Sequence, residues 1–210
     1  NLAESVEYLR QLGDNLRLLA ADPSEGDRGE VGVVRACGWW EQVGGLLSRA
    51  ARPPARVIAD IPEGLPGVRV APGRLTQAML NLIGNASDAL HEAEPPPAES
   101  IIRVSARLSP LSDGRGGVMF CVEDNGPGMT AEVARHAFDP FFTTKPRSAS
   151  TGLGLALVKG VATSAGGEAR IDSERGRGTR VCLTLPAAEE RGELRDRVSA
   201  ARERAVVVAV

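Results

Sequence analysis

The segment 73–90, GRLTQAMLNLIGNASDAL, constrains the fold most, because it carries the strongest helical pattern in the chain. Apolar residues recur there at spacings of three and four, which places them on one face of a helix. That face comprises Leu75, Met79, Leu82, Ile83, Ala86 and Leu90. A polar stripe runs along the other side and comprises Gln77, Asn81, Asn85 and Asp88. Such a helix must cover an apolar layer and leaves its polar stripe open to solvent or a ligand.

Strand-like runs supply the expected partner layer. They fall at 57–61, 101–108 and 118–124, and a hairpin is expected from 168–173 and 179–186. Further helices are expected over 36–50 and from about residue 152 onwards. The order is mixed and lacks the strict strand–helix alternation of a doubly wound sheet, so we predict an α+β fold, a two-layer α/β sandwich.

Composition narrows the class of protein. With 42% hydrophobic and 25% charged residues, the 210-residue chain is typical of a soluble globular protein. A net charge of −2 provides no field toward nucleic acid or an anionic membrane. No signal peptide and no apolar run of about 18 residues is present, so we expect no membrane contact and a cytoplasmic location. The three cysteines lack metal-ligand spacing, and we expect free, buried thiols in a reducing compartment.

The two ends of the chain leave alternatives open. Leucine and valine repeat at spacings of three and four over 1–22, beginning with Leu2 and Val6, which predicts an N-terminal stalk helix. This helix either forms a dimer seam or packs on its own domain. The chain starts inside that pattern, so we expect a fragment of a longer protein. Residues 187–210 read as a charged helix followed by AVVVAV, which either packs on this domain or begins a further one.

A strand exit at 122–129, VEDNGPGM, is the first candidate for ligand chemistry. Asp124 ends an apolar strand, which carries its carboxylate to a sheet edge. A fixed carboxylate accepts a hydrogen bond from the exocyclic amine of adenine and repels the carbonyl oxygen of guanine. Gly126 and Gly128 allow a sharp turn and the close approach of a flat base. Taken alone, this pattern is also common in ordinary turns.

A second candidate is FDPFFTTKPRSASTGLGLALVKG, residues 138–160. Gly152 and Gly154 open a helix, and the unpaired N–H groups of a helix N-terminus favour phosphate. Neither a P-loop nor a dinucleotide-binding G-x-G-x-x-G is present, so this would be a phosphate site of another design. We expect a lid over 129–151, whose base is anchored on the core by Phe138, Phe141 and Phe142.

In this order, the stretches resemble the catalytic ATP-binding domain of bacterial two-component sensor histidine kinases, of the GHKL/Bergerat type. NLIGNASDAL resembles the asparagine box, VEDNGPGM the first glycine box, FDPFFTTK the phenylalanine box, and TGLGLALVKG with GRGT the second glycine box. The resemblance covers about 30–186, and 1–22 resembles the second helix of the dimerisation hairpin. It implies a homodimer, a response-regulator receiver domain as partner, and ATP and Mg²⁺ as cofactors.

The resemblance also implies roles for single residues. Asn85 would coordinate Mg²⁺, Asn81 would help position the attacking group or the metal shell, and Lys145 would neutralise the terminal phosphate. Asp124 would bind the adenine amine, with Thr179 near the base. The nucleotide contacts that it implies are Asn85, Asp88, Asp124, Gly126, Gly128, Phe141, Thr144, Lys145, Gly152, Leu153, Gly154, Leu155 and Thr179.

Two departures from the family pattern matter. Related ATPases carry a glutamate general base four residues before the metal asparagine, whereas Asn81 stands here and cannot accept a proton from water. Asp88 stands where many members have a basic residue, and Arg135, Lys145 or Arg147 could replace that cation. We therefore expect slow hydrolysis and phosphoryl transfer to a histidine. An anti-sigma-type protein serine kinase and a scaffold that has lost ATP binding are the alternatives.

The phosphoacceptor is not expected within this chain. HEAEPP at His91 has the outline of an acceptor motif, but it lies at the end of the asparagine helix, before three prolines. His136 falls in the lid, where we expect it to pack locally or face phosphate. We expect the acceptor histidine upstream of Asn1.

Overall fold

The structure, a computed structural model, describes residues 31–145 and 150–188. Its elements in chain order are β1 (Gly32–Val34), α2 (Ala36–Arg49), β2 (Arg56–Asp60), β3 (Val68–Val70), α3 (Pro72–His91), β4 (Ile101–Pro110), β5 (Gly116–Asp124), α4 (Ala131–His136), α5 (Gly154–Ser164), β6 (Glu168–Glu174) and β7 (Gly178–Pro186). The helices and strands expected within these ranges are all present. The stalk helix and the C-terminal extension, apart from residues 187 and 188, lie outside the described residues.

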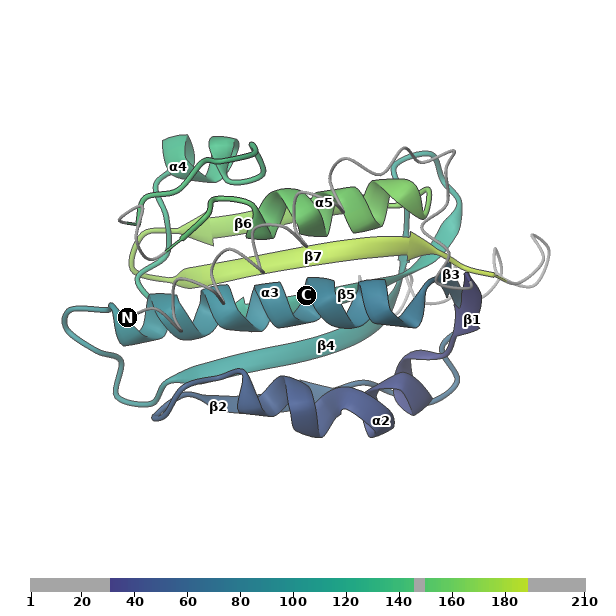
Figure 1. Cartoon of the computed structure of the whole chain (residues 1–210), viewed down its shortest axis with the longest axis horizontal. Helices are drawn as coiled ribbons and strands as arrows, with labels where there is room; N and C mark the ends of the chain where they lie inside the picture. Colours follow the sequence, from purple (N-terminus) through teal and green to yellow (C-terminus); the bar gives the residue numbers. More distant parts are fainter. Residues whose placement is uncertain (1–30, 146–149, 189–210) are drawn as a thin grey trace, which may run out of the picture.

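The main sheet has five strands in the order β2-β4-β5-β7-β6, and a small second sheet pairs β1 with β3. Only β2 and β4 run parallel within the main sheet; its other neighbours are antiparallel. Figure 1 shows α2, α3 and α5 side by side against one face of this sheet. The predicted two-layer α+β architecture is therefore confirmed.

Helix α3 forms the centre of the helical layer. Pro72 occupies its first turn, where a missing N–H costs nothing. All six apolar residues predicted for its inner face are buried. The indole N–H of Trp39 on α2 donates to Thr76 Oγ1 at 3.1 Å, and the Trp39 ring stacks edge-on against Phe120 of β5. These contacts fix α2 against both α3 and the sheet.

The register of β5 and β7 positions the ends of both strands. Asp124, the last residue of β5, lies directly opposite Thr179 near the start of β7. Ile102 of β4 flanks Asp124 on its other side. Three antiparallel strands therefore hold the carboxylate of Asp124 at one edge of the layer, under the C-terminal half of α3.

The same register overturns the prediction of free cysteines. Cys121 on β5 and Cys182 on β7 are opposite residues and form a disulfide. Cys37 is free. Spacing along the chain did not reveal the pairing, because the two cysteines are 61 residues apart and meet only through strand pairing.

Three short elements were not predicted. Strands β1 and β3 have three residues each, and α4 has six, all too short to show a period. Residues 187 and 188 extend the domain beyond the predicted end at 186, because Ala187 N–H donates to Gly116 and Ala188 N–H to Gly67.

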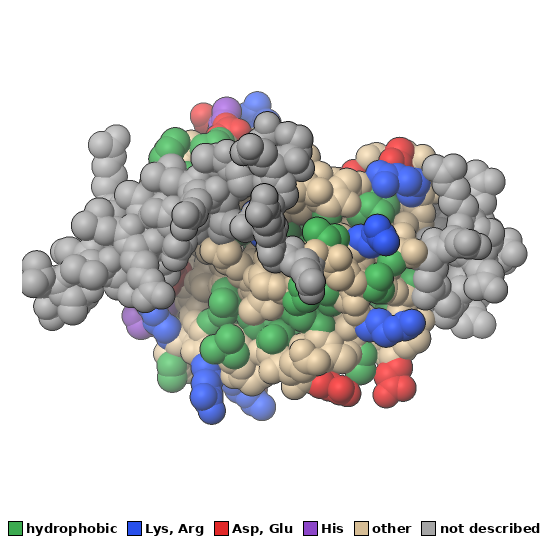
Figure 2. Space-filling view, turned by 45° about the vertical axis from the view of Figure 1, so that its right-hand side comes forward, with side chains coloured by type: hydrophobic (Ala, Val, Ile, Leu, Met, Phe, Trp, Pro, Cys, Tyr) green, Lys and Arg blue, Asp and Glu red, His purple; other side chains and the backbone are tan. Residues whose placement is uncertain are grey.

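The surface of the described part is mixed in charge. On the face shown in Figure 2, acidic and basic side chains both occur, mostly toward the margin, and hydrophobic side chains lie nearer the centre. Within 31–145 and 150–188, no helix combines the length and the apolar character that crossing a membrane would require.

Candidate nucleotide-binding site

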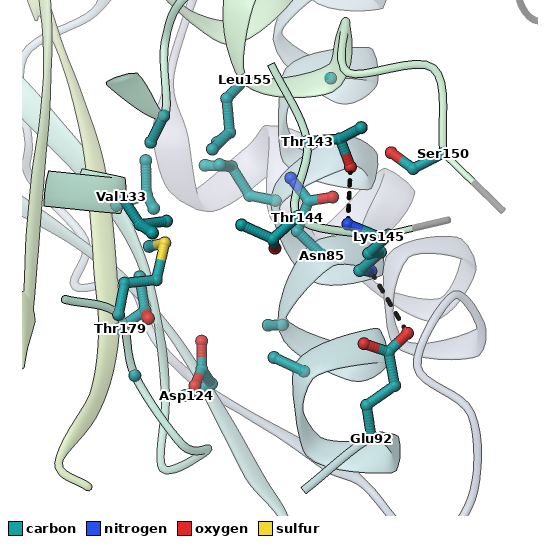
Figure 3. Close-up of a pocket in the computed structure, with 18 of the residues that line it drawn as sticks. Asn85, Glu92, Asp124, Val133, Thr143, Thr144, Lys145, Ser150, Leu155 and Thr179 are labelled. Carbon is teal, nitrogen blue, oxygen red and sulfur yellow. Dashed lines mark hydrogen bonds and ion pairs between the residues drawn. The ribbon is translucent and has the colours of Figure 1, made fainter. Parts of the chain in front are cut away.

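A cavity of about 310 Å³ lies between α3, the ends of β5 and β7, and the segment that follows α4. Figure 3 shows Asp124 and Thr179 on one wall and Asn85 and Lys145 on the other. The residues that line the cavity are Leu82, Asn85, Ala86, Ala89, Glu92, Val122, Asp124, Pro127, Gly128, Met129, Val133, Ala137, Phe142, Thr143, Thr144, Lys145, Ser150, Gly152, Gly154, Leu155, Thr179 and Val181. The cavity has both an apolar slot and polar ends, as ligand sites usually do.

Asp124 is the buried charged group of this cavity, with 6% of its surface exposed. Its Oδ1 accepts a hydrogen bond from the Gly126 N–H at 2.9 Å. Burial raises the pKa of Asp124 to about 6, with a small contribution from Glu123, and backbone hydrogen bonds from Gly126 and Thr179 oppose the rise. A carboxylate that is costly to ionise gains most from a ligand that donates a hydrogen bond to it.

The glycine loop after β5 is fastened to the turn between β6 and β7. Gly128 adopts φ +64°, and a side chain there would collide with the carbonyl oxygen of Glu174. Ser173 Oγ accepts from the Met129 N–H at 2.8 Å and lies 2.9 Å from Thr179 Oγ1. These close contacts align Met129 and Thr179 on the same wall of the cavity.

The N-terminus of α5 lies against the polar stripe of α3. A Cβ placed on Gly154 would lie 3.6 Å from Asn81 Oδ1 and 3.7 Å from Asn85 Nδ2. Gly152, with φ +67°, accepts the Phe141 N–H at 2.9 Å, and a Cβ on Gly152 would lie 2.5 Å from the Phe141 carbonyl carbon. The chain therefore meets itself at Phe141, inside the expected lid, and at Gly152, directly after it.

Lys145 provides the positive charge of the cavity. Among the described residues that line it, Lys145 alone is cationic, whereas Asp124 and Glu92 are acidic. Its Nζ lies 2.7 Å from Asp88 Oδ2 and 3.9 Å from Glu92 Oε1. Figure 3 shows the side chain descending along α3 toward Glu92.

Most of the residues implied by the family resemblance come together here. The nine that line the cavity are Asn85, Asp124, Gly128, Thr144, Lys145, Gly152, Gly154, Leu155 and Thr179. Asp88 lies behind Lys145, Gly126 orients Asp124, and Leu153 is fully buried at the start of α5. Asn81 and Phe141 do not line the cavity, although Asn81 is close to Gly154.

The predicted phenylalanine anchor is only partly correct. Phe138 packs against the core and Phe142 lines the cavity, but 64% of Phe141 is exposed, so the expectation that it anchors the lid is wrong. Its backbone is left-handed, with φ 66°. His136 packs locally, since its Nδ1 lies 2.8 Å from Asp139 Oδ2 and its ring contacts Phe142.

Sequence reasoning missed the apolar wall. Met129, Val133 and Ala137 approach the cavity from the start of the lid and from α4. Met129 stands in the quoted VEDNGPGM stretch, but nothing in that stretch shows that its side chain faces a ligand. Val133 and Ala137 have the spacing of one helix face, which a six-residue helix is too short to reveal.

A metal ion would find few protein ligands here. The described part of the chain holds no group of three or more His, Cys, Asp and Glu side chains that could bind one. Asn85 lines the cavity, and its carboxamide has one oxygen that can serve as a ligand. One protein oxygen is enough for Mg²⁺ when phosphates and waters supply the remaining ligands.

Comparison with known proteins agrees with this geometry. Residues 71–189 match the family described as histidine kinase-, DNA gyrase B-, and HSP90-like ATPase. Sensor kinase CckA of Brucella abortus (strain 2308) is 35% identical over 168 residues, which cover 77% of this chain and 18% of that protein. Sensory histidine kinase/phosphatase NtrB of Rhizobium leguminosarum bv. phaseoli is 36% identical over 143 residues, or 64% of this chain and 36% of that protein.

Solved structures give the same result. Full-length ShkA in complex with AMPPNP superimposes with a TM-score of 0.69 at 27% identity, covering 90% of this chain and 38% of that one. The mycobacterial sensor histidine kinase MprB, at 23% identity and a TM-score of 0.57, shares the fold over 76% of this chain and 99% of that one. The chain spans about a fifth to a third of the two curated relatives. It belongs to the histidine kinase-, DNA gyrase B- and HSP90-like ATPase family.

Proposed function

We propose that this chain is the catalytic ATP-binding portion of a two-component sensor histidine kinase. It binds Mg-ATP and transfers the γ-phosphoryl group to a histidine outside the described residues, for relay to an aspartate of a response-regulator receiver domain. The observation that carries the proposal is the cavity itself, with the buried Asp124 at one end and Lys145 with the N-terminus of α5 at the other.

The adenine ring would occupy the apolar slot between Ala89 on α3 and Met129 in the glycine loop. The ionised Asp124 would accept a hydrogen bond from the exocyclic amine, and Thr179 lies directly across the strand pair. Guanine presents a carbonyl oxygen at that position, which a carboxylate repels. The site would therefore select adenine.

The phosphates would extend toward Asn85, Lys145 and the start of α5. Gly152 and Gly154 line the cavity there, so backbone N–H groups can approach a phosphate closely. Asn85 would hold Mg²⁺ through its carboxamide oxygen, and the ion, when bound, would neutralise charge on the phosphates. Lys145 would bind the terminal phosphate. The residues present thus fit both cofactors.

Asn81 decides between hydrolysis and transfer. A carboxamide cannot remove a proton from water, and Asn81 lies near Gly154 beside the phosphate end. We expect catalysis by positioning and charge neutralisation of a loose transition state, with a protein side chain as nucleophile. The proposal also includes a cytoplasmic location and a homodimer formed through 1–22.

The proposal is tested by binding and by transfer. Mg-ATP should raise the melting temperature of the chain, whereas Mg-GTP should not, and Asp124→Asn should abolish the ATP shift. With γ-labelled ATP the chain should not label itself, and it should label an added dimerisation hairpin from a related sensor kinase in acid-labile form.

Other outcomes would contradict the proposal. No shift with Mg-ATP would identify a scaffold that has lost ATP binding. Acid-stable, serine-linked label on a partner would favour a protein serine kinase. Acid-labile label on His91, the exposed last residue of α3, would place the acceptor within this chain.

A further inference from the structure

We infer that Asp88 is a positioning residue, which holds the ammonium group of Lys145 at the cavity wall so that Lys145 can bind phosphate. The inference rests on the proposed function and adds a role for a carboxylate that does not itself line the cavity. It concerns three elements that are far apart in sequence: the α2–β2 loop, α3, and the segment before α5.

Both carboxylate oxygens of Asp88 have cationic partners. Oδ2 accepts a hydrogen bond from Lys145 Nζ at 2.7 Å, and Oδ1 lies 3.3 Å from Arg52 Nη1. The side chains of Asp88 and Lys145 are only 26% and 20% exposed, whereas Arg52 is 68% exposed. The Asp88–Lys145 pair is therefore the better shielded of the two and the more strongly held.

The residue before Asp88 on α3 is anchored to the α2–β2 loop. The backbone N–H of Arg52 donates to Ser87 Oγ at 2.8 Å, and Ser87 is buried on α3. This bond fixes the α2–β2 loop against the helix and places the Arg52 guanidinium beside Asp88. The carboxylate thus lies with Oδ1 toward Arg52 and Oδ2 toward Lys145.

Lys145 needs such a partner for a physical reason. A lysine side chain has a flexible four-carbon stem and loses about 2 kcal/mol of rotamer entropy when it is fixed. The ammonium has three donors, and Asp88 uses one of them. The cavity also contains the acidic side chains of Asp124 and Glu92, so an unrestrained Lys145 could pair with Glu92 instead. Asp88 limits these alternatives before a phosphate arrives.

A competing explanation is that Asp88 only repels phosphate. Its charge would then oppose nucleotide binding directly, whether or not Lys145 is present. The two explanations predict opposite signs for the same substitution. They are separated by a double-mutant cycle with Asp88→Asn and Lys145→Ala.

The cycle is measured on the whole 210-residue chain by calorimetric titration with Mg-ATP and, separately, with adenosine. We expect Asp88→Asn to weaken Mg-ATP binding about five- to tenfold, close to the loss caused by Lys145→Ala. In the Lys145→Ala background, Asp88→Asn should change the Mg-ATP affinity less than about twofold. Adenosine affinity should change less than about twofold in every variant, because adenosine carries no phosphate. Asp88→Glu, which keeps the charge, should recover at least half of the lost binding energy.

Three results would overturn the inference. One is tighter Mg-ATP binding by Asp88→Asn in both backgrounds, which means direct repulsion. Another is an equal loss for Mg-ATP and adenosine, which means structural damage. The third is a full loss in the Lys145→Ala background, which means that Asp88 acts independently of Lys145.

Two controls complete the design. Asp60→Asn removes the same charge from an exposed ion pair with Arg107 on the sheet and should leave Mg-ATP binding unchanged. If the unaltered chain binds neither Mg-ATP nor adenosine, the proposed function is wrong. If it binds both, but the effects of Asp88→Asn and Lys145→Ala on Mg-ATP binding simply add, only the role inferred for Asp88 is wrong.

Discussion

Replacement of Asp124 by asparagine should stabilise the unliganded domain at neutral pH while it abolishes ATP binding. The carboxylate is 6% exposed, and burial, aided by Glu123, raises its pKa from 3.8 to about 6 despite hydrogen bonds from Gly126 and Thr179. An asparagine side chain would keep the acceptor for the Gly126 N–H and would have no charge to bury. Asp124→Asn therefore removes a cost that develops in the folded state as pH rises above 3.8.

The sign and magnitude follow from linkage. Between pH 3.8 and 6 the folded state binds more protons at Asp124 than the unfolded state, so this group's contribution to the free energy of unfolding falls as pH rises. The pKa difference corresponds to roughly 3 kcal/mol once the pH is well above 6. At about pH 4.5 most of the folded protein carries a protonated Asp124. The destabilisation caused by burying its charge is then only roughly 1 kcal/mol.

Urea unfolding at about pH 4.5, 6 and 7.5 measures this directly, as the difference between Asp124→Asn and the unaltered chain. The difference cancels all other titrating groups. We expect the variant to be more stable by up to roughly 3 kcal/mol at about pH 7.5 and by roughly 1 kcal/mol at about pH 4.5. Asp172→Asn, an exposed acid on β6, is the control and should change stability by less than about 0.5 kcal/mol.

A variant that is less stable near pH 7.5, or a difference that does not vary with pH, would refute the reasoning. The first result would mean that the folded state favours the charged form of Asp124, and the second that its pKa is the same in the folded and unfolded states. Binding should show the opposite trend: because the proposed contact with adenine uses the ionised carboxylate, adenosine affinity should increase as pH rises through about 6. The Asp124→Asn variant should lack that increase.

The disulfide and the glycine positions give two further predictions. Reduction of Cys121–Cys182, which closes a 61-residue loop, should lower the free energy of unfolding by up to about 4 kcal/mol in urea titrations, and Cys37→Ser should have no comparable effect. Equal stability with and without reductant would contradict a native disulfide. Gly152→Ala should cost several kcal/mol and weaken Mg-ATP binding, because its Cβ would collide with Phe141, whereas Gly84→Ala, in open space on α3, should stabilise by about 1 kcal/mol. Loss of stability in both alanine variants would mean that the contact with Phe141 is not the cause.

Local patterns predicted the large elements well. The inner face of α3 was correct at every position, since burial on a helix of 20 residues imposes a period that the sequence must carry. Asp124, Lys145 and Gly154 line one cavity, and only the family resemblance had brought them together. Composition and spacing alone made each motif only a weak indication of a ligand site and did not link one motif to another.

Features that depend on pairing between distant strands could not be predicted in this way. The disulfide depends on the register of β5 and β7, which no local signal sets. The partners of Asp88 depend on where the α2–β2 loop and residue 145 fold back onto α3. Phe141 combines an exposed ring with a left-handed backbone, whereas aromatic content alone argued for a buried placement.

Two energetically unfavourable features of the folded chain lie around the same cavity. Asp124 is a buried acid whose ionisation is unfavourable, and Phe141 is the one non-glycine residue with positive φ in the described part of the chain. The hydrogen bond from Phe141 to Gly152 fastens the start of α5 at that strained position. A protein selected for stability alone would relieve both costs with an asparagine and a glycine. Asp124 lines the cavity, and Phe141 is bonded to Gly152, which also lines it. Keeping both costs there is expected where binding energy from a ligand offsets them.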